Sequence, residues 1–145
     1  MIRHLLSAIV LATSTLSASD GWQTDYKSAI EQAVKENKPV LLEFTGSTWC
    51  PPCKMMKKEV FSASDFSDFA KKNLILVEVD FLPGGKPSVS EYEKQNVALA
   101  ERYRIEGFPT VVLLDPSGKE IARHVGYLPG GPKAFISWVE NSSKK

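Results

Sequence analysis

The segment WCPPC at residues 49–53 holds the only two cysteines of the 145-residue chain. It follows a short apolar run, VLLEF at residues 40–44, and precedes a stretch whose apolar residues recur at helical spacing as far as Val60. The run has the length and composition of a buried strand, and Pro52 suits the first turn of a helix. The sequence therefore predicts a Cys-x-x-Cys pair at the junction of a strand and a helix.

The position of this pair favours redox chemistry of the thiols. A sulfur at a helix N-terminus lies near unpaired backbone amides and the positive end of the helix dipole, which favour the thiolate. The thiolate is the form that attacks a disulfide. We therefore expect Cys50 to attack a substrate disulfide and Cys53, one turn later, to resolve the mixed disulfide. The two intervening prolines lack amide protons, which leaves the amide of Cys53 as the main donor to the Cys50 sulfur.

Two other uses of the cysteines can be weighed from the residues. A metal site needs about four ligands, and only Cys50, Cys53 and His124 remain if His4 is cleaved off with the N-terminal residues described next. A structural disulfide across three residues closes a very short loop, so it constrains the unfolded chain little. We therefore expect no metal ion and no cofactor other than the redox-active disulfide Cys50–Cys53.

The N-terminal residues have the layout of a secretory signal peptide. Residues 1–4 supply a short basic start through Arg3 and His4, residues 5–16 are mostly apolar, and residues 17–19 are small enough for cleavage. The apolar stretch is shorter than the ~20 residues that span a bilayer, so we expect no permanent membrane anchor. The alternative is an ordinary N-terminal helix. This interpretation gives a signal peptide over 1–19 and one domain over 20–145, located in the periplasm or secreted.

Composition agrees with one folded domain. Hydrophobic residues make up 43% of the chain and charged residues 24%, which is ordinary for a globular protein. The net charge is +1, and no run of Lys and Arg offers a phosphate-binding stripe. We expect no nucleic-acid partner and a monomeric protein.

Apolar patterning alternates between helices and strands along the rest of the chain. Strands separated by helices, then a hairpin and a closing helix, describe one α/β sheet covered on both faces. Ser64 or Asp65 is expected to cap one helix, and Ser90 with Glu93 has capping-box spacing at the start of another. The expected helices cover residues 20–37, 52–60, 64–72, 90–104 and 132–139, and the expected strands cover 40–44, 74–81, 110–114 and 120–125.

From residue 40 to residue 139 the sequence resembles the thioredoxin family. Three blocks carry the resemblance in the family's order: WCPPC at 49–53, YRIEGFPT at 103–110, and Val125-Gly126. The segments at 44–46 and 58–61 are most similar to exported bacterial domains of this family, such as the C-terminal domain of the transmembrane disulfide reductase. The resemblance implies a thioredoxin fold, in the α/β class, with a mixed sheet of four to five strands and helices on both faces.

The resemblance also implies roles for residues around the cysteines. Pro109 matches the family's cis-proline, and Phe108 before it would offer backbone groups to an extended substrate segment. Trp49 would flank the cysteines as an apolar platform, and Gly126 would let a substrate chain approach closely. Two alternatives stay open here: Pro109 in an ordinary trans turn, and Trp49 as part of the core.

Two features depart from the family pattern. The family's buried acid, which relays a proton to the resolving cysteine, has Glu43 as its candidate, one residue further from the cysteines than usual. An insertion in the loop at 46–48 would restore the alignment, and a desolvated carboxyl there would suit a general base; otherwise Glu43 points to solvent. The lysine that often accompanies this acid has no counterpart on residues 74–81. The segment at 81–104 is also longer, either as a solvated insertion or for partner selection.

These observations predict a periplasmic or secreted disulfide reductase that acts on protein thiol and disulfide substrates. A membrane disulfide reductase would supply its electrons. The Pro-Pro dipeptide lacks the histidine found between the cysteines of strong oxidants, which favours reduction. An oxidase or isomerase stays open because redox poise depends on how the thiolate is stabilised. A non-catalytic binding or metal-delivery module also stays open because a fold alone does not fix function.

Overall fold

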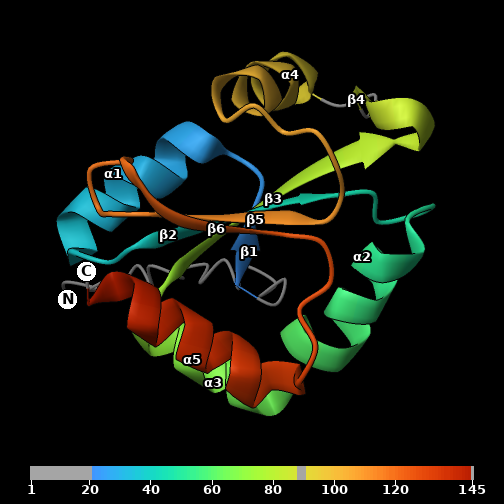
Figure 1. Ribbon diagram of the computed structural model, residues 1–145. Helices are drawn as coiled ribbons and strands as arrows, with labels where there is room; N and C mark the ends of the chain where they lie inside the picture. Colours follow the sequence, from blue (N-terminus) through green and yellow to red (C-terminus); the bar gives the residue numbers. More distant parts are fainter. Residues whose placement is uncertain (1–20, 88–90, 145) are drawn as a thin grey trace, which may run out of the picture.

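A mixed β-sheet runs through the middle of the structure, with helices on both faces (Figure 1). The computed structural model describes residues 21–87 and 91–144, so the expected signal peptide lies outside the described residues. The order across the sheet is β1 (Trp22–Gln23), β3 (Ile75–Leu82), β2 (Val40–Thr45), β5 (Thr110–Leu114) and β6 (Glu120–Val125), with β4 (Lys86–Pro87) paired to β3. Strands β1 and β2 run parallel to β3, whereas β5 is antiparallel to β2 and β6 is antiparallel to β5.

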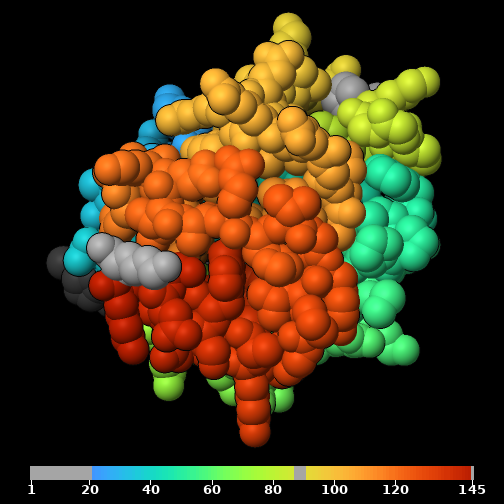
Figure 2. All heavy atoms as spheres, viewed as in Figure 1, coloured from blue at the N-terminus to red at the C-terminus, as the bar shows by residue number. Residues whose placement is uncertain are grey.

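The helices form two layers. One face of the sheet carries α1 (Tyr26–Glu36) and α4 (Glu93–Arg102), and the other face carries the remaining three helices (Figure 1). These are α2 (Pro51–Met56), which continues as a π-helix η1 (Lys57–Phe61), α3 (Ser64–Asn73) and α5 (Gly131–Ser143). The expected thioredoxin fold of the α/β class is confirmed. In the space-filling view, the C-terminal residues in orange and red cover much of one face, with α2 in green at its edge (Figure 2).

Three local predictions are wrong at the ends of elements. The helix expected from residue 20 begins at Tyr26, because Trp22 and Gln23 pair with β3 as an extra strand. Neither Ser64 nor Asp65 caps α3, whose N-cap is Ala63 with no side-chain hydrogen bond. The helix expected over 90–104 is shorter, from Glu93 to Arg102, and residue 90 lies outside the described residues.

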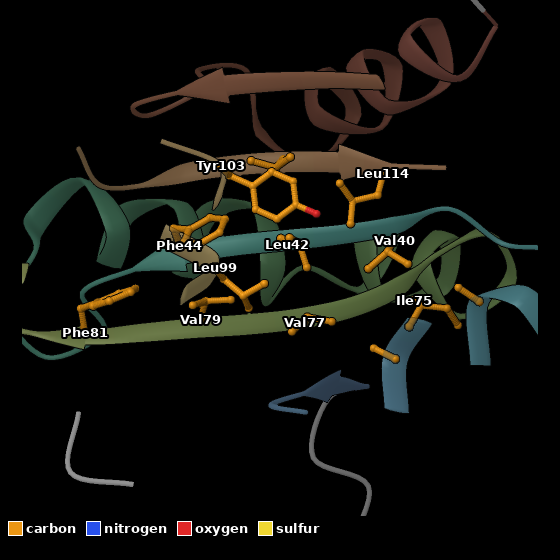
Figure 3. Close-up of a cluster of buried hydrophobic side chains, with 13 residues drawn as sticks. Val40, Leu42, Phe44, Ile75, Val77, Val79, Phe81, Leu99, Tyr103 and Leu114 are labelled. Atoms are coloured by element: carbon orange, nitrogen blue, oxygen red, sulfur yellow. The ribbon is translucent and has the colours of Figure 1, made fainter. Parts of the chain in front are cut away.

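Each face of the sheet has its own hydrophobic cluster. Because successive strand residues point to opposite faces, Val40, Leu42 and Phe44 of β2 face α1 and α4, whereas Leu41 faces the other helices. Figure 3 shows the first cluster, in which α4 contributes Leu99 to the layer on β2 and β3. The two clusters fix the sheet between its helix layers and hold the ends of β2 and β3 beside the cysteines.

Candidate active site

The two cysteines lie where the sequence predicts them, between β2 and α2. Cys50 is the N-cap residue of α2, and a disulfide joins it to Cys53 with the Cα atoms 5.2 Å apart. The amide of Cys53 donates to the Cys50 Sγ at 3.4 Å, which is the expected capping interaction. The amide of Gly46 donates to the Cys53 Sγ at 3.5 Å. Both sulfurs therefore receive backbone N–H groups, which favour a negative charge on sulfur.

The end of β3 holds the loop before the cysteines. The Asp80 carboxylate accepts hydrogen bonds from the Ser47 amide at 2.8 Å and from the Ser47 hydroxyl at 2.5 Å. The Trp49 indole donates to the carbonyl of Phe81 at 2.8 Å. Sequence reasoning missed this role of Asp80, because the two partners lie 33 residues apart and no motif joins them. The position of Asp80 near the end of a predicted buried strand was the only signal in the sequence.

Gly46 is required by the packing of Trp49. A Cβ atom at position 46 would lie 2.4 Å from the indole ring, which is a steric clash. The carbonyl of Gly46 also accepts from the amides of Trp49, at 3.2 Å, and Cys50, at 2.9 Å. This tight turn fixes the positions of both Trp49 and Cys50, and the close approach of the indole ring explains why residue 46 is a glycine.

The four residues expected to bind substrate come from three separate segments. The Phe108–Pro109 peptide bond is cis, as the resemblance implies. The rings of Trp49 and Phe108 make an edge-to-face contact with centroids 5.8 Å apart, and Trp49 is half-buried rather than a core residue. The amide of Gly126 donates to the carbonyl of Pro109 at 2.7 Å, and Gly126 has a φ of 88°. The structure thus joins Trp49 to Phe108 and Pro109 to Gly126, and their role in binding remains a prediction.

Glu43 is buried on the face of the sheet that carries α2. Its side chain is only 4% exposed, so the alternative in which it points to solvent is wrong. The pKa of the carboxyl is raised from 4.5 to about 8, mainly by burial and also by the negative charge of Glu78, whereas the positive charge of Lys57 acts to lower it. A carboxyl that titrates near neutral pH can exchange protons during turnover. Whether Glu43 serves Cys53 in this way remains a prediction.

The described part of the chain was also searched for metal sites and for membrane-spanning helices. Among residues 21–87 and 91–144, no three His, Cys, Asp or Glu side chains come together as a metal site. Within the same ranges, no helix combines the length and apolar character needed to cross a bilayer.

A disulfide at a helix N-terminus within this fold defines a thiol–disulfide oxidoreductase. The family model described as a thioredoxin-like domain matches residues 26–142, which is most of the chain. The chain therefore belongs to the thioredoxin-like family.

Curated relatives fall in one group of redox proteins. The chain is 36% identical over 132 residues to the disulfide bond reductase DsbH of Chlamydia pneumoniae, covering 91% of this chain and 78% of that protein. It is 32% identical over 119 residues to the thiol:disulfide interchange protein DsbD of Cronobacter sakazakii, covering 81% of this chain but only 18% of that protein. The similarity to DsbD thus concerns one part of a much longer protein.

Solved structures agree with this grouping. A DsbH oxidoreductase structure superposes with a TM-score of 0.76 at 35% identity, covering 99% of this chain and 95% of that one. The oxidised C-terminal domain of DsbD from Neisseria meningitidis gives a TM-score of 0.58 at 22% identity, covering 80% of this chain and 91% of that one. The second match supports the fold alone.

Proposed function

We propose that this protein reduces disulfides of other proteins in the periplasm or outside the cell. The observation that carries the proposal is the Cys50–Cys53 disulfide at the N-terminus of α2, with an amide hydrogen bond to each sulfur. The similarity to a protein named as a disulfide bond reductase, over 91% of this chain, supports the direction. The signal-peptide pattern at residues 1–19 supports the location.

The reaction begins with the reduced pair. The Cys50 thiolate attacks one sulfur of the substrate disulfide, so that a mixed disulfide forms and the other substrate sulfur leaves as a thiolate. Cys53 then loses its proton and attacks the Cys50 sulfur. The bond between Cys50 and the substrate breaks, and the second substrate thiolate leaves. The substrate gains two electrons, and the Cys50–Cys53 disulfide is formed.

Glu43 is the proposed acceptor of the Cys53 proton. It lies on the sheet face that α2 covers, three residues before Gly46, whose amide contacts the Cys53 sulfur. Its pKa of about 8 is close to the ordinary value for a thiol, near 8.5, so a proton can pass between the two groups at little cost. The carboxylate gains the proton as Cys53 becomes nucleophilic and releases it to solvent afterwards.

The proposed substrate surface consists of Trp49, Phe108, Pro109 and Gly126. An extended substrate segment would pair with backbone groups next to the cis-proline, in a short strand-addition contact. The edge-to-face contact between the Trp49 and Phe108 rings gives this surface an apolar floor. Apolar contact and backbone pairing together suit unfolded or loosely folded protein segments.

Each turnover leaves the pair oxidised, so two electrons must be supplied. We propose a membrane disulfide reductase as the donor, and a monomeric protein that needs no cofactor besides its own disulfide. The donor reaction is the reverse exchange, in which a thiol of the partner attacks the Cys50–Cys53 disulfide.

The direct test is reduction of a protein disulfide such as those of insulin, followed by labelling of the thiols that appear. The reduced protein should release two substrate thiols per molecule and become fully oxidised. With Cys50→Ser the reaction should fall to background. Undiminished activity in that variant would contradict the redox mechanism and favour a binding module.

A further inference from the structure

A cavity of about 350 Å³ opens on the α2 side of the sheet, where β1, β2, β3 and η1 each contribute to its lining. Three charged side chains line it: Glu43 from β2, Glu78 from β3 and Lys57 from η1. Trp22 and Phe61 add aromatic lining, and their rings meet edge to face with centroids 5.1 Å apart. Small-molecule sites typically have this size and this combination of apolar walls with a few converging polar groups.

The carboxyl of Glu43 has no hydrogen-bond partner within residues 21–87 and 91–144. Its side chain is only 4% exposed, and burial of a carboxyl without a hydrogen bond is costly. Over the same ranges, no fully buried side-chain oxygen or nitrogen lacks a partner, so the small exposure of Glu43 includes its carboxyl oxygens, at the cavity that it lines. A buried acid in this cavity is therefore able to accept hydrogen bonds from an occupant.

Glu78 supplies a second acceptor beside Glu43. The two residues are direct partners in the parallel register of β2 and β3, so their side chains lie on one face of strands about 4.8 Å apart. Burial raises the pKa of both carboxyls, and the negative charge of Asp80 adds to the rise at each, whereas Lys57 acts to lower both. With all three lining groups ionised, two carboxylates face one ammonium, and the lining has a net negative charge.

These features favour a cationic occupant with a flat polar head. A positive charge would offset the repulsion between the two glutamates, whereas an anion would be repelled by them. An amidinium or guanidinium group holds its N–H donors in one plane, in a geometry that matches carboxylates, and donors on its two sides can reach neighbouring carboxylates together. Trp22 and Phe61 suit the apolar body of such a molecule, and an aromatic ring face also attracts a cation.

We propose that this cavity binds a small organic cation, with an amidinium or guanidinium head on Glu43 and Glu78 and an apolar body against Trp22 and Phe61. None of the lining residues belongs to the proposed substrate surface, so the cation and a disulfide substrate would occupy different sites. Binding of the cation needs no thiol and does not depend on the role of Glu43 in turnover. Lys57 competes with the cation for the same two carboxylates.

The test uses benzamidine, a planar aromatic amidinium that is small enough for the cavity. Its binding to the oxidised protein would be measured by calorimetry at about pH 8, close to the pKa of Glu43. Benzamide is the neutral control, because it has nearly the same shape without the charge, and it should bind roughly ten-fold more weakly or less. Glu78→Gln should weaken the binding of benzamidine roughly ten-fold, since a hydrogen bond to a charged acceptor is stronger than one to a neutral acceptor. Glu43→Gln should weaken it further, because Glu43 is the more deeply buried of the two acids.

A variant that binds more tightly gives a result that damage to the fold would not produce. Lys57→Met removes the competing ammonium, so the affinity for benzamidine should rise roughly three-fold. Lys58→Met is the matched control, since Lys58 is exposed and does not line the cavity. Its affinity for benzamidine should equal that of the wild type.

Three outcomes would overturn the proposed cation site. Equal binding of benzamidine and benzamide would show that the cavity does not select a cation, and absence of binding for both would show that it is not a site for such molecules. Binding that neither glutamate variant weakens would place the probe elsewhere on the protein. Reduction of insulin by the wild type tests the redox function separately, so failure of either test leaves the other conclusion standing.

Discussion

The two faces of the sheet differ sharply along β2 and β3. Toward α1 and α4 both strands present only apolar side chains, which form one continuous cluster (Figure 3). Toward α2 the same strands begin with Leu41 and Leu76 but continue with polar residues, namely Glu43 and Thr45 on β2 and Glu78 and Asp80 on β3. The ionisable side chains of the two strands thus lie towards the carboxyl ends of one face, a place where ligands commonly bind in sheets with parallel strands, whereas the opposite face of these strands is wholly apolar.

The largest effect on thiol–disulfide exchange should follow from replacing either cysteine. Cys50→Ser should reduce the exchange rate to background, because the thiolate that attacks the substrate disulfide is lost. Cys53→Ser should keep the first step but stop there, so a mixed disulfide with the substrate should accumulate and be visible by mass spectrometry. Both variants should stay folded, since the lost disulfide closes only a short loop. Release of free substrate by Cys53→Ser at the wild-type rate would contradict the assigned order of attack.

Truncation of a core side chain on the face towards α1 and α4 should lower stability and leave the redox chemistry unchanged. Phe44 is fully buried, and Phe44→Ala should lower the free energy of unfolding by roughly 3–5 kcal/mol through lost burial and a cavity. The redox midpoint should not change, because the side chain faces α1 and α4. Denaturant unfolding and redox titration of the same preparation check both statements. A midpoint that moves with stability would show that the two faces are not separate.

Ionisation of the buried Glu43 should make the free energy of unfolding depend on pH. Its pKa is 4.5 in the unfolded chain and about 8 in the folded oxidised protein, so the folded state binds more protons between these values. The contribution of Glu43 to the free energy of unfolding should therefore be greatest below about pH 4.5 and should fall as the pH rises towards 8. Glu43→Gln should remove up to roughly 3 kcal/mol of that fall between pH 5 and 8.

The matched control for this pH prediction is Glu31→Gln, an exposed glutamate on α1. Its unfolding free energy should follow wild type at every pH. Parallel pH curves for wild type and Glu43→Gln would mean that Glu43 does not titrate in the folded protein as its burial requires.

A smaller effect is expected from the loop support at the end of β3. Asp80→Ala removes the acceptor for two hydrogen bonds from Ser47 and should cost about 1–2 kcal/mol. It should also slow the attack of Cys50 on the substrate disulfide, because the loop that carries Trp49 and Cys50 loses its hydrogen bonds to β3. The same change at Asp68, which is exposed on α3, should alter neither unfolding nor rate. Equal unfolding free energies and equal exchange rates for the two variants would contradict the proposal that Asp80 positions the loop.

Much of this architecture follows from local sequence. The apolar runs of β2, β3 and β5, the turn before β6 and the helical start at the cysteines depend on neighbouring residues, so the positions of these elements were predicted to within a few residues. The strand Trp22–Gln23 was missed because two residues form a strand only when β3 offers an edge to pair with. The cis bond before Pro109 came from the family resemblance, since the local residues allow either isomer.

The electrostatics of the site were less accessible from sequence. Strand alternation places the side chains of Glu43 and Phe44 on opposite faces of the sheet. Whether the face with Glu43 is buried depends on where α2 and η1 pack. The hydrogen bond from Ser47 to Asp80 joins residues far apart in the chain, and so does the cavity that Lys57 lines together with Glu43 and Glu78. These features require the tertiary structure, whereas the reactive pair does not.

The most direct test of the account is the redox midpoint of the Cys50–Cys53 couple. The protein would be equilibrated in graded thiol and disulfide buffers, and its free thiols would then be labelled and counted. A reductase should have a midpoint close to that of thioredoxin, about −270 mV. A midpoint of about −120 to −180 mV would instead match the oxidases and isomerases of this fold and contradict the proposed direction.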